Sequence, residues 1–288
     1  MKTQEIIALE NKYVFQTYSR FPVCITKGKG IKVTDNDGKV YLDFLTGIAV
    51  NALGHCHPEI VNAVKEQIKK LSHTSNLYYT IPQIKLAKML AELSGLQRSF
   101  FCNSGAEANE AAIKLARKYA KEKSGTGKYE IITMKGSFHG RTIATLTATG
   151  QKKIQKGFEP LLEGFKYVKY NDLIELENAV NDKTCAIMLE PVQGEGGVIV
   201  PDEDYLKNVR ALCDRKKILL ILDEVQTGLG RTGKYFAYQH AGILPDICTL
   251  AKPLGGGLPL GVMMATEAVS TGFTFGNHGS TLDRKSVV

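Results

Sequence analysis

The hydrophobic pattern of the chain changes near residue 99. Before this point, apolar and polar residues alternate on both sides of an Asp-Gly pair at 37–38, which predicts a hairpin over residues 31–44. Apolar residues at helical spacing predict two helices, over residues 59–71 and 83–93. The first hundred residues are therefore expected to form a small sheet followed by helices.

Beyond residue 99, short apolar runs alternate with amphipathic segments. The predicted strands are Ser99–Cys102, Glu130–Met134, Cys185–Glu190, Ile218–Asp223, Ile247–Leu250 and Val262–Ala265. The predicted helices between them include Ala106–Lys121, Asp172–Val180 and Asp202–Lys216. Continuously apolar strands separated by such helices indicate an α/β fold whose sheet is covered on both faces. Sheets of this kind bind ligands beyond the carboxyl ends of their strands.

Composition narrows the possible functions. The chain has 288 residues, of which 43% are hydrophobic, so it can form a large core. The net charge is +8, but acids lie among the basic residues, so binding to nucleic acid rests on total charge alone and is not expected. No apolar run approaches the roughly 20 residues that span a bilayer, and the N-terminus lacks a secretory signal. A cytoplasmic protein without a membrane partner is expected.

The six cysteines predict neither disulfides nor a metal site. They are scattered along the chain without a CxxC pair, and several lie in apolar stretches, which indicates buried free thiols. The segment His55-Cys56-His57-Pro58 could suggest a metal. No matching cluster exists elsewhere in the sequence, so a structural turn is the better interpretation.

One motif could bind a phosphate. Ser104 and Glu107 have the spacing of a capping box, directly after the predicted strand that ends at Cys102. The helix that begins there offers backbone N–H groups and the positive end of its dipole to an anion. An ordinary helix cap explains the motif equally well. Neither GxGxxG nor GxxxxGK[ST] follows the strand, so dinucleotide and P-loop sites are not indicated.

Two polar residues follow apolar strands at positions that suggest chemistry. Asp223 ends a run of five aliphatic residues, where a charge needs a partner such as the protonated ring nitrogen of pyridoxal phosphate (PLP). A helix cap or, with Glu224, a magnesium ligand is the alternative. Lys252 follows another apolar strand and precedes three glycines, and desolvation of its amine would favour Schiff-base chemistry. Its alternative is a solvated surface lysine.

A further motif follows the strand that ends at Met134. Within Gly136–Thr142, Phe138 could stack on a flat ring and Arg141 could bind a carboxylate through two hydrogen bonds. A core aromatic residue and a surface arginine are the ordinary alternatives.

In this order, the motifs resemble the class III (ornithine-type) PLP-dependent aminotransferases, from about residue 10 to Thr281. The segments that carry the resemblance are FCNSGAEANEAAIKLAR from Phe101, FHGRT from Phe138, LEPVQGEGG from Leu189, LDEVQTGLGRTG from Leu222 and LAKPLGGGLPLG from Leu250. The resemblance implies the PLP-dependent transferase fold type I, with a mixed, mainly parallel sheet. It also implies that residues 1–50 belong to a small domain and residues 51–281 form the large PLP-binding domain.

The resemblance further implies an activity. It favours N2-acetyl-L-ornithine as amino donor and 2-oxoglutarate as acceptor, within arginine biosynthesis. Ornithine, succinyldiaminopimelate and 4-aminobutyrate are alternative donors, and an inactive fragment is the alternative to an enzyme. Members of the family work as homodimers, so a homodimer is expected.

Residue roles follow from the same resemblance. Catalysis is assigned to Lys252, which holds the cofactor and moves a proton, and to Asp223, which faces the ring nitrogen. The remaining predicted cofactor contacts are Ser104, Gly105, Ala106, Phe138, Val225, Gln226 and Thr281. The predicted substrate contacts are Arg141, Glu195 and Ser280. In the family, the segment that matches Ser280 and Thr281 reaches the site of the neighbouring subunit.

The sequence departs from the family after Thr281. Residues 282–288 do not match the Gly/Asn/Pro segment that the family pattern continues with, nor is a C-terminal small domain present. The resemblance therefore predicts a truncated chain with an atypical tail.

Overall fold

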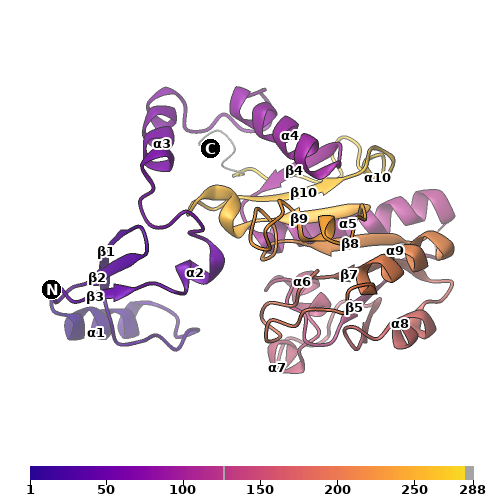
Figure 1. The fold of residues 1–288 in the computed structure, drawn as a ribbon, viewed down its shortest axis with the longest axis horizontal. Coiled ribbons are helices and arrows are strands. Elements are labelled where there is room, and N and C mark those ends of the chain that lie inside the picture. The colour runs from indigo at the N-terminus through magenta and orange to yellow at the C-terminus, as the bar shows by residue number, and fades with distance from the viewer. Residues whose placement is uncertain (126, 283–288) are drawn as a thin grey trace.

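The computed structural model describes residues 1–125 and 127–282. Its main element is a seven-stranded sheet with the strand order β4-β10-β9-β8-β7-β5-β6 (Figure 1). The strands are β4 (Arg98–Cys102), β5 (Glu130–Met134), β6 (Phe165–Val168), β7 (Thr184–Leu189), β8 (Leu219–Asp223), β9 (Ile247–Leu250) and β10 (Gly261–Ala265). Neighbours from β6 to β9 are parallel, whereas β10 is antiparallel to both β9 and β4. This confirms the predicted mixed, mainly parallel sheet and its six predicted strands.

Helices cover both faces of this sheet. One core cluster joins it to α5 (Gly105–Ser124), α6 (Ile143–Ala148) and α10 (Glu267–Ser270). The other joins it to α4 (Ile81–Ser94), α8 (Leu173–Ala179) and α9 (Tyr205–Lys216). Alternate side chains of one strand enter opposite clusters, as Ile221 and Leu222 of β8 do. Both faces of the central strands are covered by packed helices, which explains why these strands are mostly apolar.

A second, smaller sheet lies apart from the central one, near the N-terminus (Figure 1). It is antiparallel and contains β1 (Ile25–Lys29), β2 (Lys32–Asp35) and β3 (Val40–Leu42). The pair β2–β3 confirms the predicted hairpin. The other helical segments are α1 (Thr3–Tyr13), α2 (Thr46–Ala49), α3 (Pro58–Lys70), α7 (Lys152–Gln155), η1 (Ala237–Gln239) and η2 (Lys252–Gly255). Helices α3 and α4 are those predicted over residues 59–71 and 83–93.

In the turn of residues 55–58, the His55 side chain contacts Asp43, which directly follows β3, rather than Cys56. The His55 Nε2 and Asp43 Oδ2 atoms are 2.7 Å apart, and this contact lowers the pKa of the Asp43 carboxyl. The pair fixes the turn to the segment that follows β3.

The parallel strands bring distant segments to one edge of the sheet. Residues 103–106, 135–141, 190–195, 223–226 and 251–257 follow β4, β5, β7, β8 and β9, and all lie near the carboxyl ends of these strands. This arrangement puts the motifs of the sequence around one place. Within the described part of the chain, no helix is both long and apolar enough to cross a membrane.

Candidate active site

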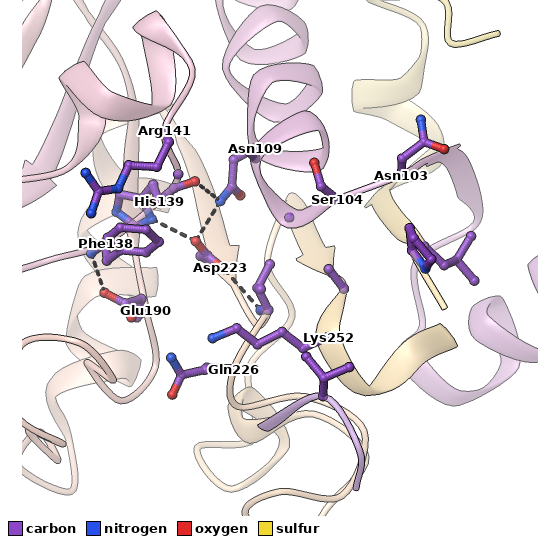
Figure 2. A pocket seen from close by; sticks show the side chains of 18 of the residues that line it. Asn103, Ser104, Asn109, Phe138, His139, Arg141, Glu190, Asp223, Gln226 and Lys252 are labelled. Carbon is purple, nitrogen blue, oxygen red and sulfur yellow. Dashed lines mark hydrogen bonds and ion pairs between the residues drawn. The ribbon is translucent and has the colours of Figure 1, made fainter. Parts of the chain in front are cut away.

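A cavity of about 440 Å³ opens at this edge of the sheet. Its walls come from the segments just named, together with residues 50, 109 and 258–260. Nine of the predicted site residues line it: Ser104, Gly105, Ala106, Phe138, Arg141, Asp223, Val225, Gln226 and Lys252. The sequence motifs therefore meet in one site, which Figure 2 shows from close by.

The N-terminus of α5 forms one side of the cavity. Ser104 caps the helix, since its Oγ accepts a hydrogen bond from Glu107 N at 3.2 Å. The backbone N–H groups of a helix's first turn have no partner inside the helix, and together with the dipole they favour an anion. Gly105 packs closely against Val225 in the neighbouring wall, since an added Cβ would lie 2.9 Å from Val225 Cγ1. The arrangement fits a phosphate group held against the helix end.

Asp223 lies at the floor of the cavity and is 3% exposed. Its Oδ1 accepts a hydrogen bond from Val225 N at 3.0 Å. Its Oδ2 accepts one from Asn109 Nδ2 at 2.7 Å and one from His139 Nδ1 at 2.8 Å (Figure 2). A carboxylate can only accept, so His139 Nδ1 carries a proton in this pair. These bonds fix the carboxylate where a protonated ring nitrogen could meet it.

Lys252 enters the same cavity from the end of β9. In Figure 2 its side chain extends between Asp223 and Gln226. Partial burial lowers the pKa of the Lys252 amine, although Glu195, Asp223 and Glu190 act in the opposite direction. A lowered pKa increases the fraction of neutral amine, which is the nucleophilic form. The backbone at Lys252 has φ +40°, a left-handed conformation that is uncommon for a residue other than glycine.

Phe138 and Arg141 form another wall of the cavity. The Arg141 guanidinium carbon lies 5.7 Å from the centre of the Phe138 ring. Arg141 is exposed at the cavity mouth, whereas the Phe138 backbone N–H donates a hydrogen bond to Glu190 Oε2 at 3.0 Å. The wall thus combines a flat apolar surface with a cation that can meet an incoming carboxylate.

Three predicted residues are not among the described residues that line the cavity. Glu195 lies beside it, where its Oε1 accepts a hydrogen bond from Gln226 Nε2 at 3.2 Å. Ser280 Oγ accepts one from Asn103 Nδ2 at 3.3 Å, so Ser280 lies next to a lining residue of its own chain. Thr281 is exposed. Their predicted contacts stay predictions. Of the predicted tail, residues 283–288 lie outside the described residues.

The sequence did not single out Asn109, His139 or Glu190, although each lines the cavity. Glu190 is 5% exposed and accepts hydrogen bonds from Phe138 N and Gly194 N. Burial raises the pKa of its carboxyl to about 7; nearby His139 lowers it and Asp223 raises it. A usable signal existed for Glu190, because it ends an apolar strand just as Asp223 does. The signal for Asn109 was its position within an apolar helix face.

The residues that line the cavity fit PLP. A half-buried amine, a fixed carboxylate and a helix N-terminus surround a cavity with an aromatic wall, and close contacts at Gly105 leave a narrow space beside Val225. These are the groups that would hold an aldehyde, a pyridine nitrogen and a phosphate. The fold and the site define a PLP-dependent enzyme of fold type I.

Comparison with known proteins gives the family. The profile of the family described as aminotransferase class-III matches residues 13–284. An acetylornithine aminotransferase of Methanocaldococcus jannaschii is 59% identical over 281 residues, which cover 98% of this chain and 71% of that protein. The chain belongs to the class III aminotransferases, which depend on PLP.

Solved structures agree with this assignment. The ornithine aminotransferase of Toxoplasma gondii superposes with a TM-score of 0.95 at 36% identity, covering 100% of this chain and 69% of that one. The N-acetylornithine aminotransferase of Stenotrophomonas maltophilia gives a TM-score of 0.81 at 41% identity, covering 98% and 69%. PLP has been observed at the active site of the Toxoplasma gondii enzyme.

Proposed function

We propose that this aminotransferase transfers the amino group of N2-acetyl-L-ornithine to 2-oxoglutarate, giving N-acetyl-L-glutamate 5-semialdehyde and L-glutamate in arginine biosynthesis. The observation that carries the proposal is the 59% identity to an acetylornithine aminotransferase over 98% of the chain. Ornithine is the second candidate donor, because ornithine aminotransferases share the fold at 36% identity. A cytoplasmic location stays a prediction.

Lys252 and Asp223 carry the central roles in this proposal. When bound, PLP supplies an aldehyde that receives the amino group and a ring that stores the electron pair freed at the donor carbon. Lys252 Nζ would hold the cofactor and, once the donor's amino group has displaced it, would accept the proton from the donor carbon as a neutral amine. The lowered pKa of Lys252 supports this role. Asp223 orients the ring through its nitrogen.

The other cofactor contacts keep the ring flat and in place. Phe138 and Val225, which both line the cavity, would contact the two faces of the ring, and Gln226 would contact its phenolic oxygen. Ser104, Gly105 and Ala106 would hold the phosphate at the N-terminus of α5. Thr281 of a neighbouring subunit adds a further contact to the phosphate.

Substrate binding uses charge at the cavity mouth. Arg141 is exposed there and binds a carboxylate that donor and acceptor share. Glu195, held by Gln226, adjusts the site to substrates of different length. Ser280, supplied by the neighbouring subunit, contacts the substrate.

The proposal includes a homodimer and a division of the chain at residue 50. Four exposed apolar residues just before and at the start of α4 support the dimer: Leu77, Tyr78, Tyr79 and Ile81 are 86%, 67%, 99% and 72% exposed. Soluble monomers rarely expose patches of this kind. The separate N-terminal sheet supports assigning residues 1–50 to a small domain. Sedimentation of wild type and Tyr79→Lys tests the dimer, and an equally dimeric variant would count against this surface.

The activity is tested by mixing the PLP-loaded protein with each candidate donor and following cofactor absorbance. N2-acetyl-L-ornithine should give the largest rate, and a larger rate with ornithine would overturn the choice of donor. Borohydride reduction followed by peptide mass spectrometry should find the cofactor on Lys252. Lys252→Ala should lose this adduct and the transamination, whereas Lys234→Ala, at a lysine whose amine bonds to the Gln239 carbonyl, should keep both.

A further inference from the structure

Asn109 is a buried amide at the centre of the site's supporting structure. It lies in the second turn of α5, is 1% exposed, and follows the proposed phosphate site by one helical turn. The residues one turn further along this helix face, Ala112 and Ile113, are buried and apolar. A buried amide in such surroundings is costly unless its polar atoms are bonded.

The Asn109 amide bonds to three other segments. Its Nδ2 donates to Asp223 Oδ2 at 2.7 Å and to the His139 carbonyl oxygen at 2.8 Å. Its Oδ1 accepts a hydrogen bond from Thr249 Oγ1 at 2.8 Å. Because a carboxylate and a carbonyl can only accept, the amide has one consistent orientation, and the Thr249 hydroxyl holds it there. Both N–H groups are used.

These bonds join the segments that carry the main groups of the site (Figure 2). Asn109 belongs to the helix whose first turn faces the phosphate, and Asp223 ends β8. His139 is part of the loop that carries the aromatic wall, and Thr249 lies on β9, three residues before Lys252. Asn109 therefore links the helix that begins at the proposed phosphate site directly to the Asp223 carboxylate.

We propose that Asn109 is a positioning residue, which fixes the Asp223 carboxylate relative to the helix N-terminus and to Lys252. It acts through Asp223 and does not itself react. The inference rests on the role of Asp223 proposed above. It makes a specific prediction, because a contact to the ring nitrogen matters only for a ligand that has this nitrogen.

The experiment compares the affinity for PLP with that for an analogue in which CH replaces the ring nitrogen. Asn109→Ala should raise the Kd for PLP about tenfold, in line with the loss of a hydrogen bond to a charged group. The Kd for the analogue should change less than about twofold, since the analogue gains nothing from Asp223. In an Asp223→Asn background, Asn109→Ala should have little further effect on the affinity for PLP, because coupled residues are not additive.

Two further variants keep the test decisive. Thr249→Val removes only the hydroxyl that orients the amide, and should weaken PLP binding in the same selective way by about threefold. Leu115→Ala creates a cavity in the core on the same helix, at a residue 1% exposed that does not line the site. It should lower the melting temperature without altering the ratio of the two affinities.

The outcomes separate this inference from the proposed function. If Asp223→Asn leaves the affinity ratio unchanged, the role of Asp223 is wrong. If Asp223→Asn removes the preference for PLP but Asn109→Ala does not, only the role of Asn109 is wrong. Equal losses for both ligands would show that Asn109 is merely structural. Should Asn109→Ala fail to fold, a Thr249→Val protein with an unchanged ratio overturns the inference.

Discussion

Replacing Gly105 with alanine should damage the cofactor site through a single methyl group. The Cβ would lie 2.9 Å from Val225 Cγ1 and 3.0 Å from Val225 Cγ2, whereas carbon atoms in contact prefer about 3.5–4.0 Å. Val225 is β-branched and stiff at χ1, so its side chain cannot simply turn away. The loop after β8 or the first turn of α5 must then move by roughly 0.5 Å or more.

Overpacking of this kind costs about 1–3 kcal/mol, which lowers the melting temperature by roughly 2–4 °C for each kcal/mol in a chain of this size. Both residues line the cavity, so the Kd for PLP should rise about tenfold, measured by absorbance titration. Gly127→Ala is the control, because an added Cβ there meets no atom within 4 Å.

The second substitution Val225→Ala makes this reasoning refutable. It removes both Cγ atoms that the new methyl would meet, so Gly105→Ala should cost less PLP affinity in this background than in the wild type. Equal costs in both backgrounds would contradict a steric cause. Wild-type affinity and stability in Gly105→Ala itself would show that the close approach has no energetic consequence.

Three further predictions follow from the site. The pKa of Glu190 is raised from 4.5 to about 7, so the folded protein binds this proton more tightly than the unfolded chain does, and the resulting stability is present below pH 4.5 and lost as the pH rises toward 7. In chemical unfolding, the free energy of unfolding of wild type minus that of Glu190→Gln should therefore fall by roughly 2–3 kcal/mol between pH 4.5 and pH 7. A difference that does not change with pH would contradict the raised pKa of Glu190. Arg141→Ala should lower kcat/KM about 10–100-fold, by raising KM for carboxylate substrates, while the Kd for PLP stays unchanged. In Gly140→Ala, the backbone has a φ of +141° and the new Cβ lies only 2.5 Å from Thr145 Oγ1. The free energy of unfolding, measured by thermal unfolding, should therefore fall by more than about 2 kcal/mol. A decrease below about 0.5 kcal/mol would be inconsistent with this strain.

The parts of the fold that were predictable are those whose signal is local. Strands β7, β8 and β9 are buried on both faces, so their sequences are mostly apolar and the limits of the strands can be recognised in the sequence. Asp223 and Lys252 each follow an apolar strand, and parallel strands end at the same edge of a sheet; the family resemblance then assigned both residues to one site. The structure places both on one cavity.

Edge elements gave a weaker signal. Strand β6 pairs only with β5, and its sequence Phe-Lys-Tyr-Val includes a charged residue because it is less completely buried. Strand β1 contains a single large apolar residue, Ile25. The turn at Thr46–Ala49 has positive φ at every residue, a conformation that only tertiary contacts select for non-glycine residues. Burial and local spacing do not encode such features.

Polar groups that support the site, such as Asn109, were not predicted from the sequence for a different reason. A capping box such as that of Ser104 and Glu107 is recognisable because its partners are three residues apart. Asn109 and Asp223 are 114 residues apart, and no spacing rule connects them. Yet a polar residue inside an apolar helix face already implies a partner, since an unbonded amide there would cost about 1–3 kcal/mol. When that helix also begins at a ligand site, the missing partner belongs to another wall of the same site, so Asn109 could have identified the network before its partners were known.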